Sequence, residues 1–96
     1  MNCNDCCDDA MSIKVINTTV GVHMDVLVYP ANNIKDLAED LGDILCLPKF
    51  SHPNNRVFIG DKADEMHLDD GSRTIEELDL KSGDTLFIGL YAGGIV

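Results

Sequence analysis

Cysteines near the N-terminus have the residue type and the spacing that metal binding uses. Cys3 and Cys6 are separated by two residues, as in one half of a zinc site, and Cys7 follows directly. The second half of such a site is missing, because none of the chain's 3 histidines has another ligand at a paired spacing. An acidic tail with incidental thiols is therefore favoured over a metal site.

Catalytic chemistry has no comparable pattern in the chain. No Ser–His–Asp or Cys–His set carries a local signature. The Gly93–Gly94 pair follows a strand-like run but no helix comes after it, so it is not a phosphate-binding loop. The acidic pairs at Asp8–Asp9 and Asp69–Asp70 are typical of solvated charge in a tail and a turn. We therefore expect no enzyme activity and no cofactor.

The charge and length of the chain limit the kinds of partner. The chain has 96 residues and a net charge of −10, with scattered basic residues. A nucleic-acid partner is not expected, because phosphate binding needs a basic face. No apolar run approaches the roughly 18 residues of a membrane span, and no signal peptide is evident. These features predict one small monomeric domain in the cytoplasm or nucleus, or both, with no membrane partner.

Two stretches with a period of two residues predict a β-hairpin. Ser12–Thr18 carries Ile13 and Val15 at alternate positions. Val22–Tyr29 alternates two sets of side chains and is ended by Pro30. The connection between the two stretches is short and contains glycine, which is typical of a hairpin.

The period then changes to that of a helix. Four apolar residues share one helical face: Ile34, Leu37, Leu41 and Ile44. Asn33 is in position to cap the N-terminus of this helix, and Asp36 suits the positive end of its dipole. The helix is predicted to end near Leu45, or at Gly42, where glycine weakens a helix. Cys46 is expected to be a small core residue.

The remaining elements are short. Arg56–Gly60 and Thr85–Leu90 are predicted strands, and another brief strand precedes a turn at Asp70–Gly71. Thr74 and Glu77 have the capping-box spacing of a short helix. Strands interrupted by one main helix predict an α+β domain in which a sheet packs on that helix.

The stretch HLDDGSRTIEELDLKSGDTLFI and the order of the elements resemble ubiquitin and its relatives. The resemblance spans about residues 11–94 and implies the β-grasp fold, a mixed sheet packed on one main helix. It implies a ubiquitin-like domain over residues 12–91. An acidic, cysteine-containing disordered tail over 1–11 would precede this domain, and a flexible tail with the diglycine over 92–96 would follow it.

The resemblance also implies a core. The family's buried positions are aliphatic or methionine in this chain: Ile13, Val15, Met24, Val26, Val28, Ile34, Leu37, Leu41, Val57, Leu68, Ile75, Leu80, Leu86 and Ile88. The strand-like and helix-like periodicities select most of the same residues, so the local patterns and the family resemblance predict the same core.

The same resemblance implies a role for the diglycine. Ubiquitin-like modifiers end in Gly-Gly and are conjugated through the terminal carboxylate. Here Gly93 and Gly94 would be the processed end, with Ile95–Val96 as the removed extension. This tail has no Arg or Lys and is one residue shorter than that of ubiquitin. Its Ala-Gly-Gly segment also resembles the ending of bacterial-type sulfur carriers.

Three functions follow from the resemblance. We expect a non-catalytic interaction domain, in which the diglycine begins a linker and receptors of the ubiquitin and proteasome pathway bind the sheet. The first alternative is a modifier precursor, processed after Gly94 and handled by conjugation enzymes. The second alternative is a sulfur carrier protein.

The binding surface is predicted from alternation along two strands. If Val57 and Ile59 point into the core, Arg56 and Phe58 point outward. In the same way, if Leu86 and Ile88 point into the core, Phe87 and Gly89 point outward. In ubiquitin an apolar patch on this face is what most receptors bind. The four outward residues are therefore the predicted partner contacts, with Gly89 leaving the patch flatter.

Overall fold

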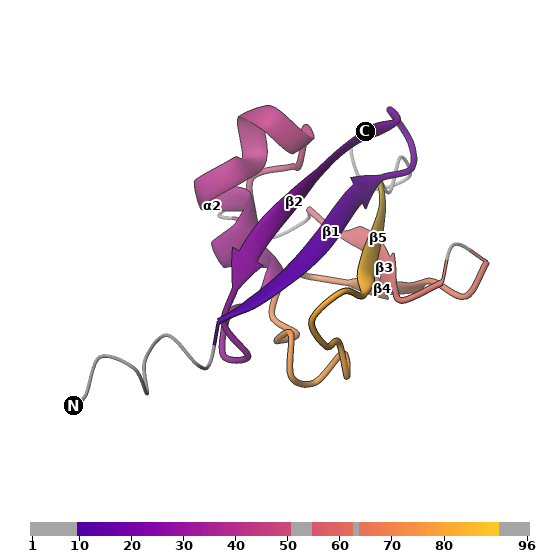
Figure 1. Cartoon of the computed structure of the whole chain (residues 1–96). Coiled ribbons are helices and arrows are strands. Elements are labelled where there is room, and N and C mark those ends of the chain that lie inside the picture. The colour runs from indigo at the N-terminus through magenta and orange to yellow at the C-terminus, as the bar shows by residue number, and fades with distance from the viewer. Residues whose placement is uncertain (1–9, 51–54, 63, 91–96) are drawn as a thin grey trace.

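The computed structural model describes residues 10–50, 55–62 and 64–90. Within these residues a helix and five strands follow one another along the chain (Figure 1): β1 (Met11–Asn17), β2 (Val22–Val28), α2 (Ile34–Leu45), β3 (Val57–Gly60), β4 (His67–Asp69) and β5 (Thr85–Leu90). The first strand begins one residue before the predicted start of the domain. The described part of the chain contains no helix with the length and apolarity needed to cross a membrane.

The five strands form one mixed sheet in the order β2-β1-β5-β3-β4. β1 pairs with β2 in antiparallel register and with β5 in parallel register. β3 is antiparallel to both β5 and β4. Figure 1 shows α2 lying beside β2 on one face of this sheet. The predicted α+β architecture, a mixed sheet packed on one main helix, is confirmed.

The core lies between the sheet and α2. Alternation places Ile13 and Val15 of β1 inside, opposite Val26 and Met24 of β2. Most of the predicted core is buried, and the structure adds further buried residues: Leu45, Leu47 and Phe50. Met24 and Leu41 are only half-buried, but both pack against the core.

The N-terminus of α2 has the predicted cap, and the cap is reciprocal. Asn33 Oδ1 accepts a hydrogen bond from the Asp36 N–H at 3.0 Å, and Asp36 Oδ2 accepts one from the Asn33 N–H at 3.0 Å. Two backbone donors that the helix leaves unpaired are thereby satisfied. The helix continues through Gly42 and ends at Leu45, the later of the two predicted ends.

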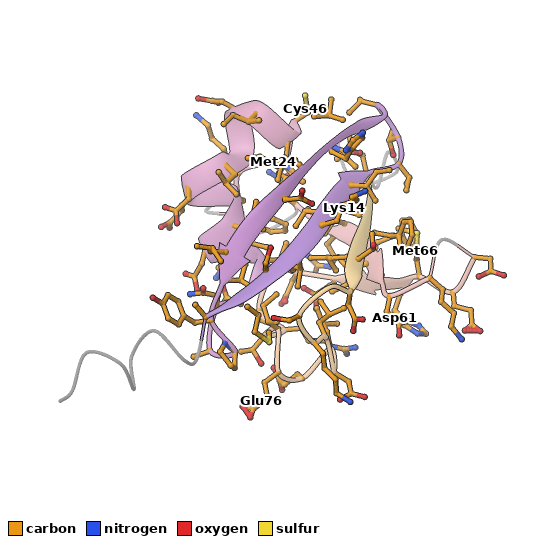
Figure 2. All side chains as sticks on the ribbon, in the orientation of Figure 1. Lys14, Met24, Cys46, Asp61, Met66 and Glu76 are labelled. Atoms are coloured by element: carbon orange, nitrogen blue, oxygen red, sulfur yellow. The ribbon has the colours of Figure 1, made fainter. Side chains whose placement is uncertain are left out.

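The C-terminal end of α2 corrects one prediction about the core and one about the apolar face of the helix. Cys46 is exposed because it forms the C-cap in the left-handed conformation, with φ of 58°. Figure 2 shows Cys46 at the outer end of the helix. Ile44 is 55% exposed, and the neighbouring Leu45 is buried in its place. The helical face that reaches the core therefore ends on Leu45.

Leu68 is also wrongly predicted as a core residue. Its strand pairs with β3 so that Leu68 lies opposite Phe58, and Asp69 lies opposite Val57. Residues that lie directly opposite in an antiparallel pair share a face of the sheet. Leu68 consequently lies on the outer face, where it is 44% exposed, and Asp69 is buried.

The predicted short helix after Thr74 is absent from the structure, which has a series of turns at residues 75–79. The capping hydrogen bonds are nevertheless present, because the Thr74 N–H donates to Glu77 Oε1 at 2.9 Å and the Glu77 N–H donates to Thr74 Oγ1 at 3.1 Å. Asp79 then adopts a left-handed conformation, with φ of 59°. This conformation ends the segment before a second helical turn forms.

Candidate functional site

The outer face of the sheet, which is the side away from α2, carries the predicted partner contacts on β3 and β5. Val57 and Ile59 are buried, so Phe58 between them lies on the outer face, where it is 36% exposed. Phe87 lies between buried Leu86 and Ile88 and is half-buried.

The strand register brings the two phenylalanines near each other. Phe58 lies opposite Gly89, and Phe87 is two residues before Gly89 on β5. The two aromatic residues are therefore diagonal neighbours on one face, within reach of large side chains. Their role as partner contacts stays a prediction.

Leu68 and Met66 also lie on this face, although alternation along β3 and β5 does not point to either residue. Leu68 is directly opposite Phe58 on β4. The methyl carbon Cε of Met66 lies 3.3 Å from the point where a Cβ of Gly89 would be. Figure 2 shows Met66 next to the part of the sheet that β3, β4 and β5 form. We call Phe58, Met66, Leu68 and Phe87 the outer-face patch.

Gly89, predicted as an outward-facing contact that leaves the patch flatter, is covered in the structure. It is buried, because Met66 Cε and Thr18 Oγ1 lie at 3.3 and 3.4 Å from the place its Cβ would take. Gly60 is covered in a related way, since a Cβ there would overlap the carbonyl oxygen of Glu65. Both glycines thus let the chain before β4 pack closely on the sheet. Met66 therefore occupies the space that a side chain at position 89 would take.

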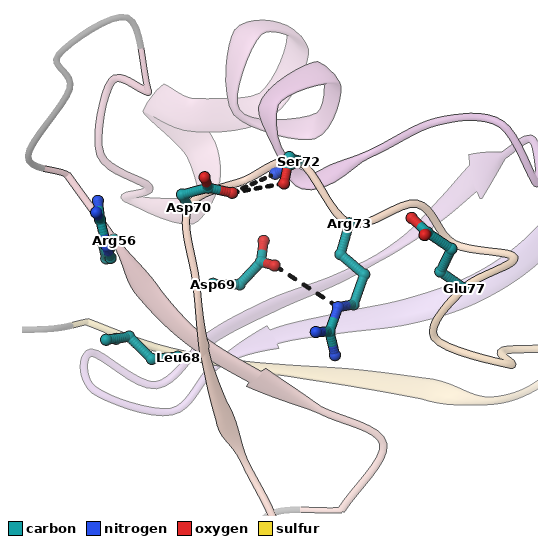
Figure 3. Close-up of a pocket in the computed structure, with 7 residues that line it drawn as sticks. All are labelled: Arg56, Leu68, Asp69, Asp70, Ser72, Arg73 and Glu77. Carbon is teal, nitrogen blue, oxygen red and sulfur yellow. Dashed lines mark hydrogen bonds and ion pairs between the residues drawn. The ribbon is translucent and has the colours of Figure 1, made fainter.

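A polar depression of about 440 Å³ adjoins the outer-face patch. Figure 3 shows the residues that line it: Arg56, Leu68, Asp69, Asp70, Ser72, Arg73 and Glu77. Leu68 belongs to both surfaces. The predicted contact Arg56 is half-buried and lines this depression.

The carboxylates of the depression are engaged within the protein. The buried Asp69 accepts a hydrogen bond from the Gly71 N–H at 2.7 Å and lies 3.8 Å from Arg73 Nε. Hydrogen bonds from the Ser72 hydroxyl and N–H lower the pKa of Asp70. Hydrogen bonds from Thr74 lower the pKa of Glu77. A carboxylate with a lowered pKa is a weak base, so Asp70 and Glu77 are better suited to a structural role than to proton transfer.

Among the residues that the structure describes, no group of His, Cys, Asp and Glu has the proximity to hold a metal ion. Cys3, Cys6 and Cys7 lie outside the described ranges, and so do Gly93 and Gly94. The metal question at the N-terminus and the processing of the C-terminus therefore stay predictions.

Comparisons with known proteins agree on the fold. No protein-family model matches the chain, and no curated protein matches its sequence. The solved structure of the ubiquitin of Caldiarchaeum subterraneum is similar, with a TM-score of 0.57 and 18% identity over 86% of this chain and 95% of that one. The C-terminal ubiquitin-like domain of mouse tubulin-specific chaperone e has a TM-score of 0.60 and 8% identity over 88% of this chain and 89% of that one. The β-grasp fold is thereby confirmed.

Proposed function

We propose that this ubiquitin-like β-grasp chain is a non-catalytic recognition module that partner proteins bind through its outer-face patch. The observation that carries the proposal is the pair Phe58 and Leu68, which lie directly opposite each other and are 36% and 44% exposed. Adjacent exposed apolar side chains on a sheet face are typical of protein interfaces. The polar depression beside them supplies the charged rim that such interfaces have.

The proposed partners are receptor proteins of the ubiquitin and proteasome pathway, which places the protein in the cytoplasm or the nucleus. The support is the fold together with the position of Phe58 and Phe87 on the sheet face that ubiquitin receptors are expected to bind. The covering of Gly89 by Met66 changes the shape of that face. We therefore infer that a receptor for this chain contacts Met66 together with Phe58.

Binding measurements with matched variants test this proposal. A panel of purified ubiquitin-receptor domains is titrated against the full chain and against Phe58→Ala, Leu68→Ala and Ile44→Ala. We expect Phe58→Ala to weaken binding by about 2 kcal/mol, roughly 30-fold, as the loss of an aromatic anchor does. Ile44→Ala is the control, because it removes an exposed apolar side chain from α2. Unchanged binding by a folded Phe58→Ala variant rejects the outer-face patch.

The diglycine supports a second candidate function, that of a conjugated modifier. The last described residue, Leu90, is held beside the β1–β2 turn, where its N–H donates to Thr19 Oγ1 at 2.9 Å. Figure 1 shows the end of β5 next to that turn. The segment that contains the diglycine therefore follows a strand end that is held to the β1–β2 turn. Incubation of the chain in native extract should then remove Ile95–Val96 and give an ATP-dependent adduct that Gly94→Ala abolishes. If the chain stays intact and no adduct forms, the modifier function is rejected. The sulfur-carrier alternative is not tested by this experiment and stays a prediction.

A further inference from the structure

A depression of about 610 Å³ lies between α2 and the segment that follows this helix. Its floor combines Ala38 and Gly42 of the helix with the buried side chains of Leu47 and Phe50. Its rim is exposed and charged: Lys35, Glu39, Asp40, Asp43 and Lys49. We call this surface the α2 depression. It is separate from the outer-face patch, which lies on the side of the sheet away from α2.

Hydrogen bonds hold the walls of the α2 depression. The Leu47 N–H donates to the carbonyl oxygen of Gly42 at 3.0 Å, which ties the following segment to the helix. Asn55 Nδ2 donates to the carbonyl oxygen of Lys49 at 2.6 Å, and Phe50 is packed into the core. The depression is therefore formed in the chain by itself, so a partner does not have to order it on binding.

Gly42 keeps the α2 depression open, although the fold does not need glycine at this position. Its backbone is helical, and outside the helix a Cβ there would meet only the carbonyl oxygen of Leu47, at an ordinary contact distance of 3.7 Å. Glycine destabilises the interior of a helix relative to alanine. What glycine provides here is open space beside Leu47, into which a side chain of another molecule fits.

One end of the rim is basic. Lys35 lies in the first turn of α2, and its Cγ is close to the ring of Phe50, since these atoms lie 3.1 and 2.7 Å from the place that a Cβ of Gly71 would take. Lys49 directly precedes Phe50 and also lines the depression. Two lysines therefore border the end of the depression that Phe50 forms.

The other end of the rim is acidic. Asp43 lies in the last turn of α2, and this turn has no basic residue. The C-terminal end of a helix carries a partial negative charge, so a carboxylate there raises the negative potential. Glu39 lies one turn before Asp43 on the same side of the helix, and Asp40 follows it. No ion pair within the described part of the chain engages these three carboxylates. A cation from another molecule is therefore stabilised at this end.

Shape and charge together select the occupant. Ala38 and Gly42 are four residues apart, so they form the kind of groove into which a row of side chains from another helix packs. A second copy of the chain, packed antiparallel, would pair Lys35 with Asp43 but would bring Glu39, midway between them, against itself. Such a copy also has a net charge of −10, so self-association is disfavoured.

We propose that the α2 depression binds an amphipathic helix of a partner protein that carries arginine or lysine at one end of its apolar row and a carboxylate at the other. One apolar side chain of this helix lies above Gly42 and contacts Leu47 and Phe50. The cation of the partner approaches Asp43, and its carboxylate approaches Lys35. The apolar row supplies the contact area, and the two charged ends fix the direction of the partner helix. This proposal does not depend on the proposed function, because the outer-face patch takes no part in it.

Nuclear magnetic resonance with the full ¹⁵N-labelled chain tests the site. The probe is a hydrocarbon-stapled helical peptide with a row of leucines, two glutamates at its N-terminal end and two arginines at its C-terminal end. Its net charge of zero removes any general attraction to the acidic chain, and a matched peptide has glutamine at the four charged positions. We expect the charged peptide to shift the amide signals of residues 38–43 and 49–50. The glutamine peptide should bind about tenfold more weakly, and added salt should weaken the charged peptide, because exposed charge pairs are screened.

Substitutions at Gly42 separate binding from stability. Gly42→Leu fills the depression and should weaken the peptide about tenfold, whereas Gly42→Ala should weaken it less. Both variants should unfold at the same urea concentration as the native chain or at a higher one, because each replaces a glycine inside the helix. A purely structural role of Gly42 would give the opposite result, with lower stability and an unchanged affinity.

Two charge reversals give the matched comparison. Asp43→Lys lies at the acidic end and should weaken the charged peptide at least threefold, and a peptide with glutamate in place of its arginines should recover binding to this variant. Asp25→Lys makes the same change of charge at an exposed residue of β2 and should leave the affinity unchanged. Equal effects of the two reversals, equal binding of the charged and glutamine peptides, undiminished binding by Gly42→Leu, shifts centred on Phe58 and Leu68, or no shift at millimolar peptide would each overturn the proposal.

Discussion

The side-chain amide of Asn17 donates a hydrogen bond to the main-chain carbonyl oxygen of Leu45 at 2.9 Å, across 28 residues of sequence. The same amide nitrogen lies 3.4 Å from the carbonyl oxygen of Cys46, and Asn17 Oδ1 accepts the Thr19 N–H at 3.1 Å. A helix leaves its last carbonyl groups without partners, and here a buried side chain from the end of β1 supplies one. Asn17 therefore connects the hairpin to the C-terminus of α2.

Replacing Asn17 with alanine should destabilise the fold by about 2–3 kcal/mol. The variant loses its side-chain hydrogen bonds and leaves the buried carbonyl of Leu45 without its donor. Urea unfolding measures the loss. Asn55→Ala is the control, because Asn55 Nδ2 also donates to a carbonyl oxygen, that of Lys49 at 2.6 Å, in an exposed setting. Equal losses in the two variants would contradict the role given to Asn17.

Truncation of two apolar residues of α2 should have very different effects on stability. Leu37 is buried against the sheet, so Leu37→Ala should cost about 2–5 kcal/mol of unfolding free energy. Ile44 is on the exposed side, so Ile44→Ala should change stability by no more than about 0.5 kcal/mol. Thermal and urea unfolding of both variants measure the difference. A large loss in Ile44→Ala would show that this side chain has a packing partner.

The local patterns of the sequence predict the elements of this fold well. Alternation in β1 and β2 and the helical spacing after Asn33 depend on neighbouring residues, and they locate these elements to within a residue or two. Errors arise where a position depends on pairing with another strand or on the way in which a helix ends. Leu68 was misplaced because its face is set by pairing with β3. Cys46 was misplaced because the helix ends there in a left-handed cap.

The outer-face patch also contains residues that local patterns predict and residues that they do not. Phe58 and Phe87 follow from alternation along single strands. Met66 and the covering of Gly89 depend on how the chain between β3 and β4 packs on the sheet, and no local pattern reports that path. Two consecutive carboxylates, Asp69 and Asp70, look alike in the sequence, yet the structure buries the first and exposes the second.

The turn after β4 requires glycine at position 71. Gly71 has φ of +91°, and a Cβ there would lie 2.7 Å from Phe50 Cδ1 and 3.1 Å from Lys35 Cγ. Gly71→Ala should therefore cost about 2–4 kcal/mol, the sum of backbone strain and overpacking. Gly21→Ala has similar strain, with φ of +81°, but no atom within 4 Å of the new Cβ.

The comparison of the two glycine variants separates strain from packing. Gly21→Ala should cost only about 1–2 kcal/mol, which is the penalty of the left-handed backbone alone. Unfolding free energies from urea titration give both values. If the two variants lose the same stability, the contact with Phe50 makes no contribution, and the strain of the backbone explains both losses.

The Thr74–Glu77 pair should make part of the stability dependent on pH. Hydrogen bonds from the Thr74 N–H and hydroxyl, together with the charge of Arg73, hold the pKa of Glu77 below its ordinary value in the folded chain. Because the pKa of Glu77 is lower in the folded chain than in the unfolded chain, folding favours the carboxylate form. The contribution of this carboxylate to stability is therefore fully present above the unfolded pKa, about 4.3. It is lost as the pH falls through the lower, folded pKa.

Glu77→Gln isolates this contribution from those of the other carboxylates, which titrate in both proteins. We expect the native chain to be more stable than the variant at pH 7, and the difference to shrink steadily as the pH is lowered from 5 to 3. Urea unfolding at several pH values measures the difference. In a Thr74→Val background the hydroxyl donor is gone, so the same Glu77→Gln comparison should depend less on pH. A difference that stays constant from pH 7 to pH 3 would show that folding does not favour the Glu77 carboxylate.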